Sequence, residues 1–358
     1  MSIWDTVRGQ DTAIDLLRRS VQRGRLAHGY AFHGPRGCGR RLVARKLAQS
    51  LFCPEVPDNE LDACGTCPSC RQIAAGSHPD LLTVAKPADK KTIPLDALIG
   101  EPEKRGRQGL CYELSMRPLA APRRVAIIDD ADALAVEGAN ALLKTLEEPP
   151  AGAILILIAE SPESLLPTIR SRCQPLHFAP LADAAIVDLL TAAGHDAADA
   201  AAVAPLADGS LETAEQLLDP DLRALRETAR SGLAAVPYNA LAVAESSRKA
   251  VEAIGSDAPS QRTAARTLFR FLIDLLRDAV RATITGDGPT DAVALSGSLG
   301  GDDEAKLETL GRLIDRITTA ESQIAMMMPV PLCLDGLFDD LGVIRRGADR
   351  EMLELPLW

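Results

Sequence analysis

The chain has 358 residues, a length that fits roughly two or three domains of ordinary size. Hydrophobic residues make up 46% of it, which is enough for a core, and aromatic residues only 3%. The formal charge of −11 argues against a general nucleic-acid coat, so any DNA contact would have to be local or shared with other proteins.

The beginning of the chain and its apolar runs bear on where the protein works. No stretch reaches the roughly 18 apolar residues of a membrane span. Residues 1–6 lack the basic region and the apolar run of a signal peptide. We therefore expect a cytoplasmic protein without membrane contact, whose eight cysteines are thiols or metal ligands and not disulfides.

The first half of the chain alternates short apolar runs with helical patterns. A helix is predicted after the first run, at 41–51, and another at 139–146. The predicted strands are 29–32, 81–84, 124–128 and 154–158. This alternation is typical of a parallel sheet covered by helices.

The second half is predicted to be almost entirely helical. Residues 180–220 read as short, alanine-rich helical pieces, and residues 267–276 carry a strong apolar helix stripe. Residues 286–303 are rich in Gly, Ser and Asp and are predicted to form a loop. We divide the chain into an α/β domain at 1–179, a small helical lid at 180–220 and a helical domain at 221–358.

A phosphate-binding loop with altered chemistry follows the first predicted strand. Gly34 and Gly39 fit the two glycines of the frame G-x-x-x-x-G-K-[ST], and Gly37 lies between them. Arg40 stands where the lysine should reach the β- and γ-phosphates, and Arg41 stands where a hydroxyl should hold Mg²⁺. A planar guanidinium does not replace a lysine, and arginine has no hydroxyl. The loop therefore predicts an anion site or two solvated arginines, without ATP hydrolysis.

Four cysteines lie just after this loop and its helix. Cys53, Cys64, Cys67 and Cys70 have the spacing C-x10-C-x2-C-x2-C, which suits a closed tetrahedral Zn²⁺ site of the structural kind. A redox role for one C-x2-C pair and plain packing are the alternatives. We predict a structural zinc module at 53–70.

Three stretches carry a family resemblance. They are residues 24–34, the cysteine cluster inserted after the loop helix, and residues 139–150 together with 168–173. With these stretches the chain resembles bacterial DNA polymerase III clamp-loader subunits of the AAA+ class. The resemblance implies an AAA+ fold of the RecA-like kind, with a helical lid and an all-α collar at 221–358 that serves oligomerisation.

Within that family, the altered positions favour the delta-prime class over the ATP-hydrolysing gamma/tau class. Asp129 could still hold Mg²⁺ through water, but Asp130 replaces the family's catalytic glutamate. Glu160 stands at the first sensor position, where the family has Thr or Asn. Glu212 stands at the second sensor position, where the active family has arginine. The carboxylate of Glu160 at the first sensor position would repel a γ-phosphate. The resemblance therefore implies a subunit with no ATPase activity of its own, in which ATP or phosphate binding is doubtful.

Arg172 differs from these altered positions, because it is kept. In the family, the arginine of this Ser-Arg-Cys segment enters the ATP site of a neighbouring subunit, where it stabilises charge on the transferring phosphoryl group. The resemblance thus implies an arginine finger that acts in trans. The alternative is that Arg172 merely caps the preceding helix.

The resemblance also implies partners. They are the gamma/tau and delta subunits, with the sliding clamp and primer-template DNA reached through the complex, in the DNA polymerase III holoenzyme. Two other functions stay open at this point: an ATP-hydrolysing gamma/tau-like subunit with an atypical loop, and a zinc scaffold with no role in replication.

Overall fold

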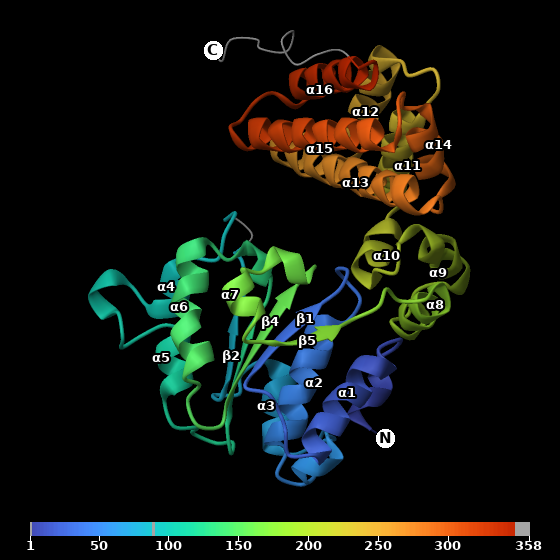
Figure 1. Cartoon of the computed structure of the whole chain (residues 1–358). Coiled ribbons are helices and arrows are strands. Elements are labelled where there is room, and N and C mark those ends of the chain that lie inside the picture. The colour runs from blue at the N-terminus through green and yellow to red at the C-terminus, as the bar shows by residue number, and fades with distance from the viewer. Residues whose placement is uncertain (1, 88–89, 348–358) are drawn as a thin grey trace. The chain divides into compact units, whose positions relative to one another are not determined.

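A computed structural model describes residues 2–87 and 90–347 (Figure 1). The chain forms two compact units, Met1–Glu215 and Gln216–Trp358. Each unit is described by itself. Within the described residues, no helix is both long and apolar enough to cross a bilayer.

The first unit is built on a parallel sheet of five strands in the order β2-β3-β4-β1-β5. The strands are β1 (Gly29–His33), β2 (Leu81–Val84), β3 (Arg124–Ile128), β4 (Ala153–Ala159) and β5 (Gln174–His177). The four strands predicted from the sequence are present. The fifth, β5, was missed because three of its four residues are exposed at the sheet edge and carry no apolar run.

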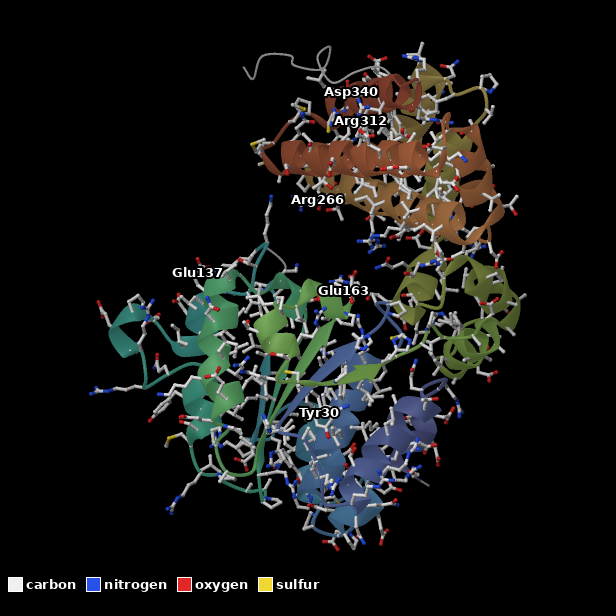
Figure 2. All side chains as sticks on the ribbon, viewed as in Figure 1. Tyr30, Glu137, Glu163, Arg266, Arg312 and Asp340 are labelled. Atoms are coloured by element: carbon white, nitrogen blue, oxygen red, sulfur yellow. The ribbon has the colours of Figure 1, made fainter. Side chains whose placement is uncertain are left out.

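Helices cover both faces of this sheet (Figure 1). Tyr30 and Phe32 point to a core shared with α1 and α2, where Figure 2 labels Tyr30. Ala31, one residue out of step, points to the opposite core shared with α6. This alternation is the two-residue period of a strand. The helices of the first unit are α1 (Asp11–Gln22), α2 (Arg40–Phe52), α3 (Pro68–Ala75), α4 (Leu95–Ile99), α5 (Leu110–Ser115), α6 (Val136–Glu147), α7 (Pro167–Arg170), α8 (Asp183–Ala192), α9 (Ala197–Val203) and α10 (Leu211–Leu217).

The second unit is helical throughout its described part. Its helices are α11 (Pro220–Ala234), α12 (Ala240–Ile254), α13 (Ala258–Thr285), α14 (Thr290–Ser298), α15 (Asp303–Ala325) and α16 (Val330–Arg345). The apolar stripe predicted at 267–276 lies in α13 and buries Leu268, Leu272 and Leu275.

The prediction of a loop at 286–303 is wrong in its central part, which forms α14. Ala292 and Leu295 of this helix are fully buried. Tertiary burial therefore outweighs the local Gly, Ser and Asp composition, which favours turns.

The predicted α/β architecture with a helical carboxyl-terminal region is confirmed. The division into three domains stays a prediction. Most of the segment proposed as a separate lid, as far as Glu215, groups with the first unit.

Candidate functional site

The segment predicted to bind phosphate is the loop that connects β1 to α2. Gly37 and Gly39 have φ angles of 68° and 101°, which favour glycine. A Cβ atom on Gly37 would lie 2.3 Å from Ser210 Oγ, just before α10. The amide of Leu211 also donates to the Gly37 carbonyl at 3.2 Å. The loop therefore packs directly against the beginning of α10.

Arg40, at the lysine position, is buried with 8% of its surface exposed. Its Nη1 donates to the carbonyl of Ala159, the last residue of β4. Arg41 is exposed and its Nε lies 3.4 Å from Asp129 Oδ2. The guanidinium of Arg40 is thus hydrogen-bonded at the end of the sheet. The guanidinium of Arg41 lies beside Asp129, the carboxylate that was predicted to hold Mg²⁺.

Arg36 links the loop to two acidic residues. Its Nη2 lies 2.8 Å from Asp130 Oδ1, after β3, and its Nε lies 2.8 Å from Glu160 Oε1, after β4. Burial would lower the pKa of Arg36, but the charges of Asp130, Glu160 and, on α10, Glu212 raise it overall. Three of the altered family positions therefore surround one guanidinium. No pattern in the sequence pointed to Arg36, which occupies a variable position of the loop frame.

Asp129 stays close to this network. Burial raises the pKa of the Asp129 carboxyl, Arg41 lowers it, and the neighbouring Asp130 raises it again, so the net direction is upward. The positive charges of the loop are thus matched by carboxylates of the same chain.

Gln10 is a second residue of this region that the sequence did not reveal. Its amide is buried, and its Nε2 donates to the carbonyls of Cys38 at 3.0 Å and Ala179 at 2.8 Å. Its Oε1 accepts the N–H of Ala179 at 3.2 Å. Gln10 thereby fixes the loop to the segment that leads from β5 into α8. Glutamine is mostly exposed in proteins, so a single sequence offers no sign of such a role.

Arg172 lies just beyond α7. Its Nη1 donates to the carbonyl of Thr168 at 2.9 Å and to Ser171 Oγ at 3.3 Å, and its Nη2 lies 2.6 Å from Glu147 Oε1. The bond to Thr168 is the helix-capping contact that the alternative interpretation predicted. In the described part of the chain, the side chain of Arg172 makes no contact with the phosphate-binding loop.

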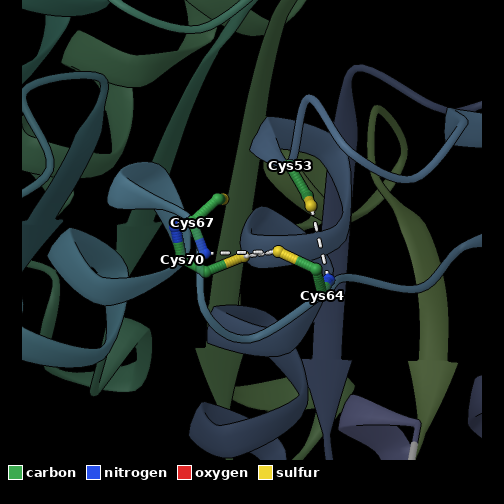
Figure 3. Close-up of side chains that lie close together, drawn as sticks. All are labelled: Cys53, Cys64, Cys67 and Cys70. Carbon is green, nitrogen blue, oxygen red and sulfur yellow. Dashed lines mark hydrogen bonds between the residues drawn. The ribbon is translucent and has the colours of Figure 1, made fainter.

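The four predicted cysteines come together (Figure 3). Their Sγ atoms all lie within 4.8 Å of one another, and those of Cys64 and Cys70 are 4.0 Å apart. A tetrahedral ion with metal–sulfur bonds of about 2.3 Å would place sulfur atoms about 3.8 Å apart. The donor set and its spacing therefore fit a metal ion with four thiolate ligands.

Backbone amides of the same segment donate hydrogen bonds to these sulfur atoms. The amides of Cys64, Cys67 and Cys70 donate to the sulfur atoms of Cys53, Cys64 and Cys67, respectively, at 3.3–3.4 Å. Backbone N–H groups of Thr66 and Cys67 lower the pKa of Cys64 to about 6. Burial raises the pKa of Cys70 to about 12. A bound cation would favour the thiolate at each position, so the cluster could bind a metal.

Comparison with known proteins finds relatives of the first half of the chain. Residues 9–182 match the family described as "DNA polymerase III, delta subunit". The delta' subunit of DNA polymerase III from Bacillus subtilis strain 168 is 39% identical over 181 residues, which is 51% of each chain. The Escherichia coli K12 delta' subunit is 35% identical over 164 residues, or 46% of each chain.

The similarity extends to the related subunit class. The gamma/tau subunit of Mycobacterium tuberculosis H37Rv is 38% identical over 176 residues, covering 48% of this chain and 28% of that one. A solved gamma-subunit-related protein from Thermotoga maritima has a TM-score of 0.44 and 17% identity, covering 93% of this chain and all of that one. The chain spans about half the length of the delta' relatives it matches. Over the part that these matches cover, the chain is similar to the delta-prime subunits of the bacterial DNA polymerase III clamp loader, in agreement with the resemblance of its motifs.

Proposed function

We propose that this chain is a delta-prime-like subunit of the DNA polymerase III clamp loader that does not hydrolyse ATP. In this proposal it gives Arg172 to the ATP site of a neighbouring gamma/tau-like subunit while the sliding clamp is loaded. The observation that carries the first part is the pairing of Arg36 with Asp130 and Glu160 in the phosphate-binding loop.

Magnitudes indicate why this pairing opposes nucleotide binding. Each exposed ion pair contributes only about 0.2–1 kcal/mol, so breaking the pairs of Arg36 is a small cost. The larger cost is the repulsion between phosphate and the carboxylates that remain. Two like charges about 4 Å apart repel by roughly 4 kcal/mol at an effective dielectric constant of about 20. Asp130 and Glu160 both stand where this repulsion would be felt.

Hydrolysis is opposed further by the loop itself. Arg40 is turned into the end of the sheet and bonded to a carbonyl oxygen, whereas the family's lysine reaches the phosphates. Arg41 offers no hydroxyl and sits beside Asp129, whose carboxylate would be needed for Mg²⁺. The loop with Gly34, Gly37 and Gly39 can still admit a small anion. It would bind such an anion more weakly than an intact site binds a nucleotide.

The proposed role of Arg172 rests on its position in the Ser-Arg-Cys segment and on its accessibility. The side chain is 36% exposed and ends in a guanidinium that the loop of its own chain does not use. A guanidinium supplied from a neighbouring subunit stabilises the charge on the transferring phosphoryl group. The gamma/tau and delta subunits, the clamp and primer-template DNA are the partners this role requires, and residues 221–358 are proposed as the collar that joins the subunits.

The cysteine cluster is proposed to hold one structural Zn²⁺. Cys53, Cys64, Cys67 and Cys70 would supply all of the ligands, so no open position would remain for catalysis. The ion would join the end of α2 to the beginning of α3.

The test is steady-state ATP hydrolysis by the reconstituted loader with primed DNA and clamp. Arg172→Ala should slow the one site that it serves by about 10³–10⁵-fold, so the complex should lose the share of turnover that this site provides. Arg170→Ala is the matched control, because Arg170 is an exposed arginine only two residues away, at the end of α7. The isolated chain should show no ATP turnover.

Two results would contradict the proposal. Normal ATP turnover by the complex with Arg172→Ala would show that Arg172 does not act as an arginine finger. Turnover by the isolated chain would replace the proposal with the alternative of a gamma/tau-like ATPase.

A further inference from the structure

We propose that Glu147 is a positioning residue that orients Arg172 for a neighbouring ATP site. This inference rests on the proposed function of Arg172. Glu147 is the last residue of α6, and its Oε1 lies 2.6 Å from Arg172 Nη2. Its side chain is half exposed, so the pair lies at the surface, where a second subunit can approach.

The guanidinium is held from two sides and still has donors to give. A guanidinium carries five N–H groups. The two on Nη1 are directed to Thr168 O and Ser171 Oγ, and one on Nη2 is directed to Glu147. In the described residues, the Nε–H and the second Nη2–H have no protein partner. A phosphate can therefore accept hydrogen bonds from Arg172 while Glu147 and Thr168 keep their contacts.

The end of α6 and the backbone of Arg172 both lie against the beginning of β1. The ring Nε2 of His28 lies 3.2 Å from the carbonyl of Leu146, next to Glu147. A Cβ atom on Gly29 would lie 3.0 Å from a methyl group of Leu146 and 3.3 Å from the carbonyl oxygen of Arg172. The end of α6 thus packs against His28 and Gly29, and the backbone of Arg172 lies beside the same Gly29. Their relative position is set by the fold, and the Glu147 carboxylate adds the direction of the side chain.

The benefit of such a contact is pre-organisation. A free arginine side chain samples many rotamers, and ordering it during the reaction costs rate. Because the Glu147–Arg172 pair is partly exposed, its effect should be modest, roughly two- to five-fold. The effect should appear in kcat, since the finger acts on charge that develops in the transition state. The KM for ATP should change by less than about two-fold.

The experiment compares Glu147→Gln, Glu148→Gln and Arg172→Ala in the reconstituted loader with ATP, primed DNA and clamp. Glu148 is the matched control, because it is the adjacent exposed glutamate and, in the described residues, its carboxylate contacts no cation. The Arg172-dependent rate is the difference between wild type and Arg172→Ala. We expect Glu147→Gln to remove about half to four fifths of that rate, and Glu148→Gln to leave it unchanged.

A double variant separates positioning from a general structural effect. In the Arg172→Ala background, Glu147→Gln should have no further effect on kcat, because a residue that acts through Arg172 has nothing left to orient. A further loss of kcat in that background would overturn the inference, and so would equal rates for Glu147→Gln and Glu148→Gln. Neither result would contradict the proposed role of Arg172 as an arginine finger. If Arg172→Ala itself leaves the rate unchanged, the proposed function fails and the inference falls with it.

Discussion

At the scale of single residues, the buried carboxylate of Asp80 organises an exposed loop. Asp80 has 0% of its surface exposed. Its Oδ1 accepts the amide of Leu119 at 2.8 Å, and its Oδ2 accepts those of Ala120 at 2.7 Å and Ala121 at 2.8 Å. Arg124 Nε lies 3.4 Å from Oδ1. The loop is thus held firmly although the side chain of Leu119 is 75% exposed.

Replacing this carboxylate should be costly. Asp80→Ala leaves three amides without their acceptor and the buried Arg124 without its counter-charge, so the free energy of unfolding should fall by about 3–5 kcal/mol. Asp96→Ala, at an exposed aspartate, should change it by less than about 0.5 kcal/mol. Urea denaturation measures both. A loss below 1 kcal/mol for Asp80→Ala would show that water satisfies the amides instead.

The same residue predicts a pH dependence. Burial alone would raise the pKa of Asp80, but the amides of Leu119, Ala120 and Ala121 and the charge of Arg124 lower it overall. Because the folded-state pKa lies below the unfolded value of about 3.9, the stabilisation is present above that pH. It is lost as the pH falls toward the folded-state pKa. Asp80→Asn should therefore flatten stability measured between pH 5 and pH 2, and an unchanged profile would contradict this account.

At the scale of elements, the proposed zinc ion would join α2 to α3. Its presence can be tested directly. The purified chain should contain about one zinc per molecule by elemental analysis, and Cys70→Ser should abolish it. Chelation should lower the unfolding temperature, because ion binding is coupled to folding of the cluster. Cys111→Ser is the control, since Cys111 lies outside the cluster and should leave the zinc content unchanged. A metal-free wild type with normal stability would favour the packing alternative.

The elements also show how far a single sequence leads. Strands β1, β3 and β4 were predictable because buried parallel strands are continuous apolar runs. The exposed edge strand β5 and the small helix α14 lack such a signal, and only their tertiary surroundings define them. The cysteine cluster was predictable from spacing. The partners of Arg36 and Arg172 were not, since each ion pair joins segments far apart in sequence.

At the scale of the whole molecule, each compact unit has polar and apolar supports of its own. In the second unit, Arg230 is buried and pairs with Asp278 at 3.1 Å and with Asp291 at 2.5 Å. These contacts join α11 to α13 and α14. The core clusters around the sheet contain residues of the first unit alone.

Arg230→Met should therefore destabilise one unit selectively. The change removes the buried cation that pairs with Asp278 and leaves the exposed Arg281, whose Nη1 lies 3.8 Å from Asp278 Oδ1, so it should cost the second unit about 3 kcal/mol. Hydrogen exchange should quicken in α11, α13 and α14, while β1, β3 and β4 keep their protection. Equal loss of protection in the sheet would mean that the two units unfold as one.

The internal pairing of the phosphate-binding loop has a consequence for how such a subunit behaves in a cell. A pocket filled by a ligand is occupied according to mass action, so its fold follows the concentration of that ligand. Arg36, Asp130 and Glu160 are tethered in one chain and meet at any concentration. Under the proposed function, the shape of this loop would therefore not depend on the concentration of ATP in the cell.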